Sequence, residues 1–132
     1  MTDALDDILG RHRGGEAVGI TSVCSASPLV LRAACEQAAA EKAAVLIEAT
    51  SNQVDQFGGY TGMTPAGFRD LVGDIADRAG LPRSRIVLGG DHLGPNVWRS
   101  RPAAEAMDRA DDLVRAYVEA GADFVLVGAD VA

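Results

Sequence analysis

The residues with the clearest chemical potential lie in segment 89–96, which reads Gly-Gly-Asp-His-Leu-Gly-Pro-Asn. It follows the apolar run Ile86-Val87-Leu88, which predicts a buried strand. A carboxylate and an imidazole therefore come together where that strand ends, and α/β proteins place their chemistry at this end of their strands. Asp91 and His92 are candidate catalytic or ligand residues. A structural hydrogen-bonded turn is the alternative for an adjacent Asp and His.

Polar side chains also close two other predicted strands. A strand expected at about 18–23 has Ser22 and Cys24 at its carboxyl end, and the apolar run 44–47 closes on Glu48. The carboxyl ends of parallel strands line one rim, so we expect these side chains on the same side of the sheet. The set comprises Ser22, Cys24, Glu48, Asp91 and His92.

A carboxylate and a neutral imidazole are suitable ligands for zinc or manganese. A metal that polarises a carbonyl or hydroxyl group needs a nearby carboxylate to move the proton. Catalytic zinc usually takes three protein ligands, so this rim is one ligand short unless Glu48 or Cys24 completes the set.

Segment 49–64 joins amides, hydroxyls, two aromatic residues and three glycines with one charged residue. Long connections of this kind are functional or disordered, and the low charge favours an ordered binding loop. Its amides suit sugar hydroxyls and its glycines allow backbone N–H groups to approach a phosphate, while ordinary loop polarity and flexibility are the alternatives. The candidate substrate contacts are Ser22, Cys24, Asn52, Gln53, Gly59, Tyr60 and Asn96.

Periodicity predicts the elements that must position these residues. Strands are expected at about 18–23, 44–48, 86–90 and 123–128, with helices at 3–13, 28–40, 65–79 and 102–121. Ser27 and Thr64, each followed by proline, have the residue types that cap helix starts. Two helices are expected to turn an apolar stripe inward. The stripes are Leu29, Val30, Ala33, Ala34 and Ala38 in the helix at 28–40, and Met107, Ala110, Val114, Tyr117 and Val118 in the helix at 102–121.

Strands that alternate with helices require right-handed crossovers and a parallel sheet. The predicted class is therefore α/β, as the amino-terminal half of a (β/α)8 barrel, with a complete small doubly wound sheet as the competing architecture. The 132 residues suffice for one compact domain, 1–132, but fall short of the roughly 250 of a whole barrel.

Composition narrows the function classes. The net charge of −7 argues against nucleic acid as a partner. No apolar run approaches the roughly 18 residues of a membrane span, and the acidic start lacks the basic region of a signal peptide, so we expect a cytoplasmic protein. Cys24 and Cys35 lack the spacing of a disulfide scaffold or a structural metal site. Phosphate-loop and serine-hydrolase motifs are absent from the sequence.

Segments 23–25, 47–54, 56–65 and 89–96 closely resemble the non-catalytic subunit family of tagatose-bisphosphate aldolase, also labelled tagatose 6-phosphate kinase. The resemblance runs from about Ile8 to Gly121. It implies the amino-terminal portion of a (β/α)8 barrel related to class II aldolases, which use a divalent metal such as zinc or manganese. By similarity, Asp91 would transfer a proton and His92 would bind the metal.

The resemblance implies a role in galactitol- or tagatose-type carbohydrate metabolism, with a sugar phosphate as ligand. The leading hypothesis is an accessory subunit, or a fragment of one, that partners a class II aldolase catalytic subunit and is inactive alone. The second is a ketose-phosphate 4-epimerase, in which Glu48 or Asp91 moves protons beside a metal held by His92. The third is a half-barrel interaction module that self-associates through open sheet edges.

Overall fold

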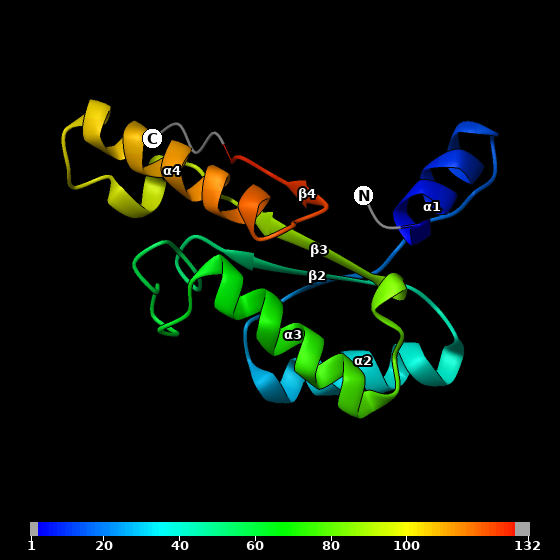
Figure 1. Ribbon diagram of the computed structural model, residues 1–132. Helices are drawn as coiled ribbons and strands as arrows, with labels where there is room; N and C mark the ends of the chain where they lie inside the picture. Colours follow the sequence, from blue (N-terminus) through cyan, green and yellow to red (C-terminus); the bar gives the residue numbers. More distant parts are fainter. Residues whose placement is uncertain (1–2, 129–132) are drawn as a thin grey trace.

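A four-stranded parallel sheet forms the centre of the computed structural model, which describes residues 3–128 (Figure 1). Its order is β1-β2-β3-β4, so neighbours in sequence are neighbours in the sheet. The strands are β1 (Ser22–Cys24), β2 (Val45–Thr50), β3 (Ile86–Asp91) and β4 (Phe124–Val125). A doubly wound sheet reverses its strand order at a switch point, whereas this order is the one found in successive units of a (β/α)8 barrel. The half-barrel prediction is confirmed over this part of the chain.

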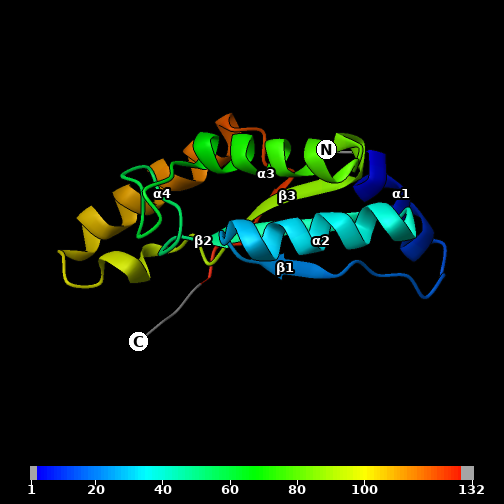
Figure 2. The same ribbon diagram turned by 90° about the horizontal axis from the view of Figure 1, so that it is seen from below.

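Helices connect the strands and cover one face of the sheet. Figure 2 shows α2 and α3 side by side in front of the strands, and their residues are in contact. α1 instead contacts the start of β3 at the opposite end from the candidate site. The helices are α1 (Asp3–Arg13), α2 (Pro28–Glu41), α3 (Pro65–Ala79) and α4 (Ala103–Glu119), with short 3-10 helices η1 (Arg83–Arg85) and η2 (Pro95–Trp98). None of the described helices is long and apolar enough to cross a membrane.

The core lies between the helices and this covered face. In β2, Val45, Ile47 and Ala49 are buried, while the residues between them are only partly buried. This period of two follows from the pleat of a strand, which sends alternate side chains to opposite faces. Phe68 of α3 is fully buried in the same core. We call the other face, which carries Ser22, Cys24, Glu48 and Asp91, the polar face.

The helix starts differ in how they are capped. Thr64 precedes α3 and its hydroxyl oxygen accepts a hydrogen bond from the Gly67 N–H at 3.3 Å, as predicted. Ser27 precedes α2 but its side chain makes no capping bond. The prediction of a Ser27 cap was therefore wrong, and Pro28, with φ preset for the first turn, is the local feature that favours the start of α2.

Two strands are shorter than predicted. β1 covers 22–24 rather than 18–23, and β4 covers 124–125 rather than 123–128. Among the described residues β1 pairs with β2 alone and β4 with β3 alone. Each of them pairs with only part of a longer neighbour, β1 with 46–48 of β2 and β4 with 89–90 of β3, so the side-chain pattern overestimates the paired length.

The inner faces of α2 and α4 were predicted only in part: Ala38 of α2 and Ala110 and Tyr117 of α4 are buried as predicted, but four other apolar side chains are not. Leu29 and Val30 are 67% and 43% exposed, and Met107 and Val118 are 55% and 59% exposed. The faces that pack inward repeat at helical spacing. They are formed by Leu31, Cys35 and Ala38 in α2, and by Ala106, Ala110, Leu113 and Tyr117 in α4.

Candidate functional site

The sheet register places three acidic or nucleophilic side chains together on the polar face. Cys24 of β1 lies opposite Glu48 of β2, and Thr50 of β2 lies opposite Asp91 of β3. The ligand atoms of Cys24, Glu48 and Asp91 all lie within 4.8 Å of one another. The predicted gathering of strand ends at one rim is therefore present, while the roles of these residues stay predictions.

Hydrogen bonds connect this cluster to its neighbours. The Ser22 hydroxyl donates to Glu48 Oε1. Cys24 Sγ lies 3.8 Å from Asp91 Oδ2, and the other carboxylate oxygen, Oδ1, lies 2.8 Å from His92 Nδ1. His92 thus enters the site as the partner of Asp91 rather than as a member of the three-residue cluster.

The Cys24 thiol is held in its neutral form. Its pKa rises from the ordinary value of 9.0 to about 11, first because partial desolvation of the sulfur penalises the thiolate and then because Glu48 and Asp91 repel it. A thiol of this kind is a weak nucleophile near neutral pH. Beside the two carboxylates, the local electrostatics disfavour a third negative charge on Cys24 unless a cation enters the cluster.

The donor set fits a divalent metal. A thiolate and carboxylates are ligands that zinc accepts, and manganese favours the carboxylates. A cation near the cluster would oppose the repulsion that raises the Cys24 pKa. These residues therefore suit a metal chemically, and Cys24 and Glu48, which sequence reasoning offered as completing ligands, lie beside Asp91.

Two glycines allow the end of β3 to pack closely. A Cβ on Gly89 would lie 2.0 Å from the Phe124 ring, and a Cβ on Gly90 would lie 2.6 Å from Leu93 Cδ1. Phe124 lies opposite Gly89 in the β3–β4 register. Gly89 and Gly90 thus allow close packing next to Asp91. The sequence motif did not predict this structural role.

The loop between β2 and α3 is ordered by its own hydrogen bonds, as predicted. Asp55 is 7% exposed, and its Oδ1 accepts from the N–H groups of Phe57 and Gly59 at 2.7 and 2.9 Å. The Gln53 side chain accepts from the Thr50 N–H at 2.9 Å. Sequence reasoning missed Asp55 because a single acidic residue among loop amides is not distinctive, although an Asp shortly before Gly58-Gly59 is typical of a turn in which the carboxylate accepts from nearby backbone N–H groups.

The predicted substrate contacts in this loop differ in availability. Asn52 and Tyr60 are exposed, Tyr60 by 74%. Gln53 and the Gly59 N–H already have partners within the loop, so a sugar hydroxyl or a phosphate would compete with those bonds. All four remain predicted contacts, and the geometry favours the two exposed ones.

Tyr117 of α4 supports the same rim from the covered side. Its hydroxyl lies 3.3 Å from the Ala49 carbonyl oxygen and 3.4 Å from that of Val54. Burial, with smaller effects of Cys24 and Asp55, raises the pKa of Tyr117, so the phenol stays protonated and able to donate. Sequence periodicity predicted that Tyr117 faces inward but gave no signal for these bonds across 63 and 68 residues.

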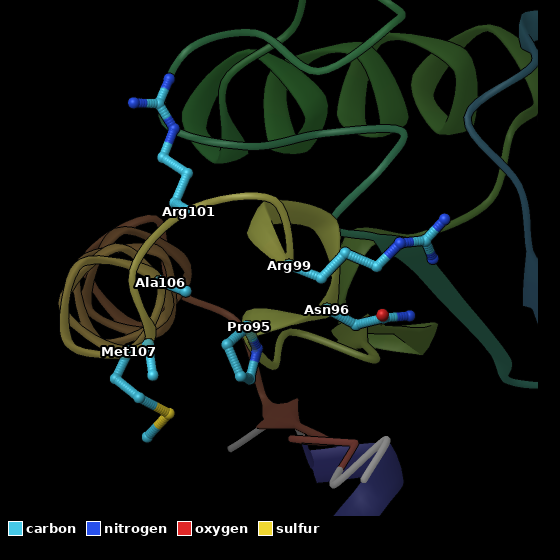
Figure 3. A pocket seen from close by; sticks show the side chains of 7 residues that line it. Pro95, Asn96, Arg99, Arg101, Ala106 and Met107 are labelled. Carbon is cyan, nitrogen blue, oxygen red and sulfur yellow. The ribbon is translucent and has the colours of Figure 1, made fainter. Parts of the chain in front are cut away.

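Asn96 belongs to a different hollow, shown in Figure 3, between η2 and the start of α4. This cavity of about 260 Å³ is lined by Pro95, Asn96, Arg99, Arg101, Ala103, Ala106 and Met107. Figure 3 shows the guanidinium groups of Arg99 and Arg101 pointing away from Pro95 and Met107, and Arg101 pairs with Glu105 at 3.0 Å. The hollow has no converging cationic groups of the kind that bind phosphate.

Several known proteins that resemble this chain in sequence belong to one family. The family described as "D-tagatose-1,6-bisphosphate aldolase subunit GatZ/KbaZ-like" matches residues 5–130. The D-tagatose-1,6-bisphosphate aldolase subunits GatZ of Klebsiella pneumoniae and Salmonella newport are 60% and 57% identical to this chain over 117 residues. Each alignment covers 89% of this chain and 28% of the relative.

A solved structure agrees with these sequence relatives. The crystal structure of a probable tagatose 6 phosphate kinase from Sinorhizobium meliloti 1021 is 58% identical and superimposes with a TM-score of 0.78. The match covers 82% of this chain and 28% of that one, so the chain spans little more than a quarter of its relatives' length. The chain belongs to the GatZ/KbaZ-like family of D-tagatose-1,6-bisphosphate aldolase subunits.

Proposed function

We propose that this chain is part of a non-catalytic subunit of a class II tagatose-bisphosphate aldolase, acting in galactitol- or tagatose-type carbohydrate metabolism. The observation that carries the proposal is the 60% identity to a relative named as this aldolase subunit over 89% of the chain. Cytoplasmic conditions would keep the two free cysteines, Cys24 and Cys35, reduced.

The experiment is to mix the chain with a class II tagatose-bisphosphate aldolase catalytic subunit. We expect co-elution in size-exclusion chromatography and a longer half-life of aldolase activity on warming. The Phe68→Ala variant, which loses a fully buried core side chain, is the matched control and should lose both effects with its fold. Neither co-elution nor any change in the partner's activity or stability would contradict the proposal.

A second candidate, a metal-dependent ketose-phosphate 4-epimerase, is supported by the clustering of Cys24, Glu48 and Asp91. A divalent metal would polarise the substrate oxygen and stabilise the charge that develops there. In this candidate Glu48, which accepts a hydrogen bond from Ser22, and Asp91, which contacts His92, would accept and return the protons. Together they resemble the acid and base pair that epimerisation requires.

Conversion of tagatose 6-phosphate to fructose 6-phosphate in the presence of zinc or manganese tests this candidate. Glu48→Gln and Asp91→Asn should each abolish turnover, whereas Glu41→Gln on the exposed side of α2 should leave it unchanged. No fructose 6-phosphate from the unaltered chain would rule the activity out for it.

A third candidate is self-association into a larger barrel without activity. Among the described residues each edge strand has one partner, and Ser22 and Cys24 on β1 are exposed. Proteins cover such edges by pairing or with other elements. Light scattering should then give twice the chain mass, and a monomer at high concentration would count against it.

A further inference from the structure

His92 has an unusual backbone for a residue at the end of a strand. Its φ is +53°, and among the described residues the other non-glycine residue with positive φ is Lys42, which ends α2. The left-handed region is disfavoured for residues with a Cβ, and such conformations persist where surrounding contacts impose them. The contacts around His92 therefore indicate what imposes this one.

Ser51 supplies the contact on the β2 side. Thr50 and Asp91 are the last pair of the β2–β3 ladder, so Ser51 and His92 stand just beyond it. There the Ser51 hydroxyl, on a side chain only 3% exposed, donates to the His92 carbonyl oxygen at 2.9 Å. On the β4 side, the next N–H, that of Leu93, donates to the Leu126 carbonyl oxygen at 3.0 Å. The turn at His92 is held from both neighbouring strands.

This turn sets the position of the imidazole. His92 Nδ1 lies 2.8 Å from Asp91 Oδ1. Since a carboxylate accepts, Nδ1 carries the proton and Nε2 becomes the basic nitrogen of the neutral ring. Gly128 lies against the ring, where a Cβ would come within 2.9 Å of His92 Cδ2. Backbone turn, carboxylate and glycine together select one ring position.

We propose that Ser51 is a positioning residue for His92, holding the left-handed turn that presents the imidazole to Asp91 as a single tautomer. The inference rests on the proposed function for its consequence, because Asp91 and His92 are candidate residues of that site. The Ser51 hydroxyl, buried in the loop after β2, would then orient His92 for proton transfer or for ligand binding. In metal sites, residues that hydrogen-bond to a histidine orient it in the same way.

Nuclear magnetic resonance of the imidazole nitrogens tests the proposal directly. The chain has two histidines, and His12 on the exposed side of α1 is an internal reference. At about pH 8, where an ordinary imidazole is neutral, we expect the wild-type His92 to show mainly the Nδ1–H form. Ser51→Ala should lower that population and move the His92 signals toward those of His12. Ser51→Thr, which keeps the hydroxyl, should restore it, and Ser27→Ala, lacking such a bond, should change nothing.

Two results would overturn the proposal. One is a wild-type His92 protonated mainly at Nε2, and the other is a folded Ser51→Ala variant with an unchanged His92 pattern. If Ser51→Ala does not fold, Ser51→Cys replaces the hydroxyl with a weakly donating thiol, and an unchanged His92 pattern in that variant would also overturn the proposal. These spectra need neither substrate nor partner, so their failure is distinguishable from failure of aldolase support.

Discussion

Ile47 and Glu48 are consecutive residues of β2 that serve opposite faces of one sheet. Ile47 is fully buried against the helices, while Glu48 contacts Ser22 and lies beside Cys24 and Asp91 on the polar face. The contrast shows how a single strand supplies both scaffold and chemistry through its period of two. It also predicts two kinds of mutational effect, a loss of stability on the covered face and little change of stability on the polar face.

The largest expected effect is on the covered face. Ile47→Ala should lower the free energy of unfolding by about 2–5 kcal/mol, because it leaves a cavity in a packed core. Glu48→Gln, one residue away, keeps the size of the side chain and an oxygen that can accept from Ser22, so it should change that free energy by only about 0.5 kcal/mol. Urea unfolding followed by circular dichroism measures both. Equal losses from the two substitutions would remove the distinction between the faces.

The reactivity of the Cys24 thiol tests the electrostatics of the polar face. With its pKa near 11 instead of 9.0, its thiolate fraction at about pH 8 falls roughly 100-fold, and alkylation should slow accordingly. Glu48→Gln should accelerate the reaction by removing one repelling charge. Peptide mapping after iodoacetamide treatment separates Cys24 from buried Cys35. A Cys24 that reacts like a free thiol would contradict the assigned electrostatics.

The same shift has a consequence for stability. The folded state holds the Cys24 proton more tightly than the unfolded chain does, so stability contributed by this group falls as the pH rises from about 9 to about 11.

Gly89 tests how closely the polar face is packed near β4. Gly89→Ala should cost about 1–3 kcal/mol, because its Cβ would enter the space of the Phe124 ring. Combining it with Phe124→Ala should recover part of the loss, giving a coupling energy in a double-mutant cycle. Thermal unfolding of the four proteins measures it, and strictly additive losses would show that the ring can move aside freely.

The smallest effect is expected among the helix caps of the covering layer. Thr64→Ala should lower stability by about 1 kcal/mol, since it removes the hydroxyl that caps α3. Ser27→Ala is the matched comparison, and should cost no more than about 0.5 kcal/mol because Ser27 makes no capping bond. The order of the two losses in urea unfolding is the decisive readout.

The order of elements was predictable because strands and helices leave different periods in the sequence, and 45–50 and 65–79 show both clearly. The inner face of α2 could be predicted only in part. Leu29 and Val30 compete with Leu31 for the inner face in an alanine-rich helix, so only packing against α3 decides between them. The lengths of β1 and β4 depend on pairing, which is likewise a tertiary property.

The site divides in the same way. Cys24, Glu48 and Asp91 were found from strand ends, because parallel strands must bring these ends to one rim. Ser51 and Tyr117 were not identified as supports of that rim, because their hydrogen bonds join residues 41 to 68 positions apart. Sequence patterns thus predicted the side chains that could react, but not the side chains whose hydrogen bonds support them.

The central claim is that Cys24, Glu48 and Asp91 form one site on the polar face, and a titration with Co²⁺ followed by absorption spectroscopy tests it most directly. We predict a thiolate-to-cobalt band that strengthens as the pH rises, disappears in Cys24→Ser and weakens in Glu48→Gln and Asp91→Asn, while Glu41→Gln leaves it intact. A band that survives Cys24→Ser, or no band at any pH in the unaltered chain, would contradict the claim.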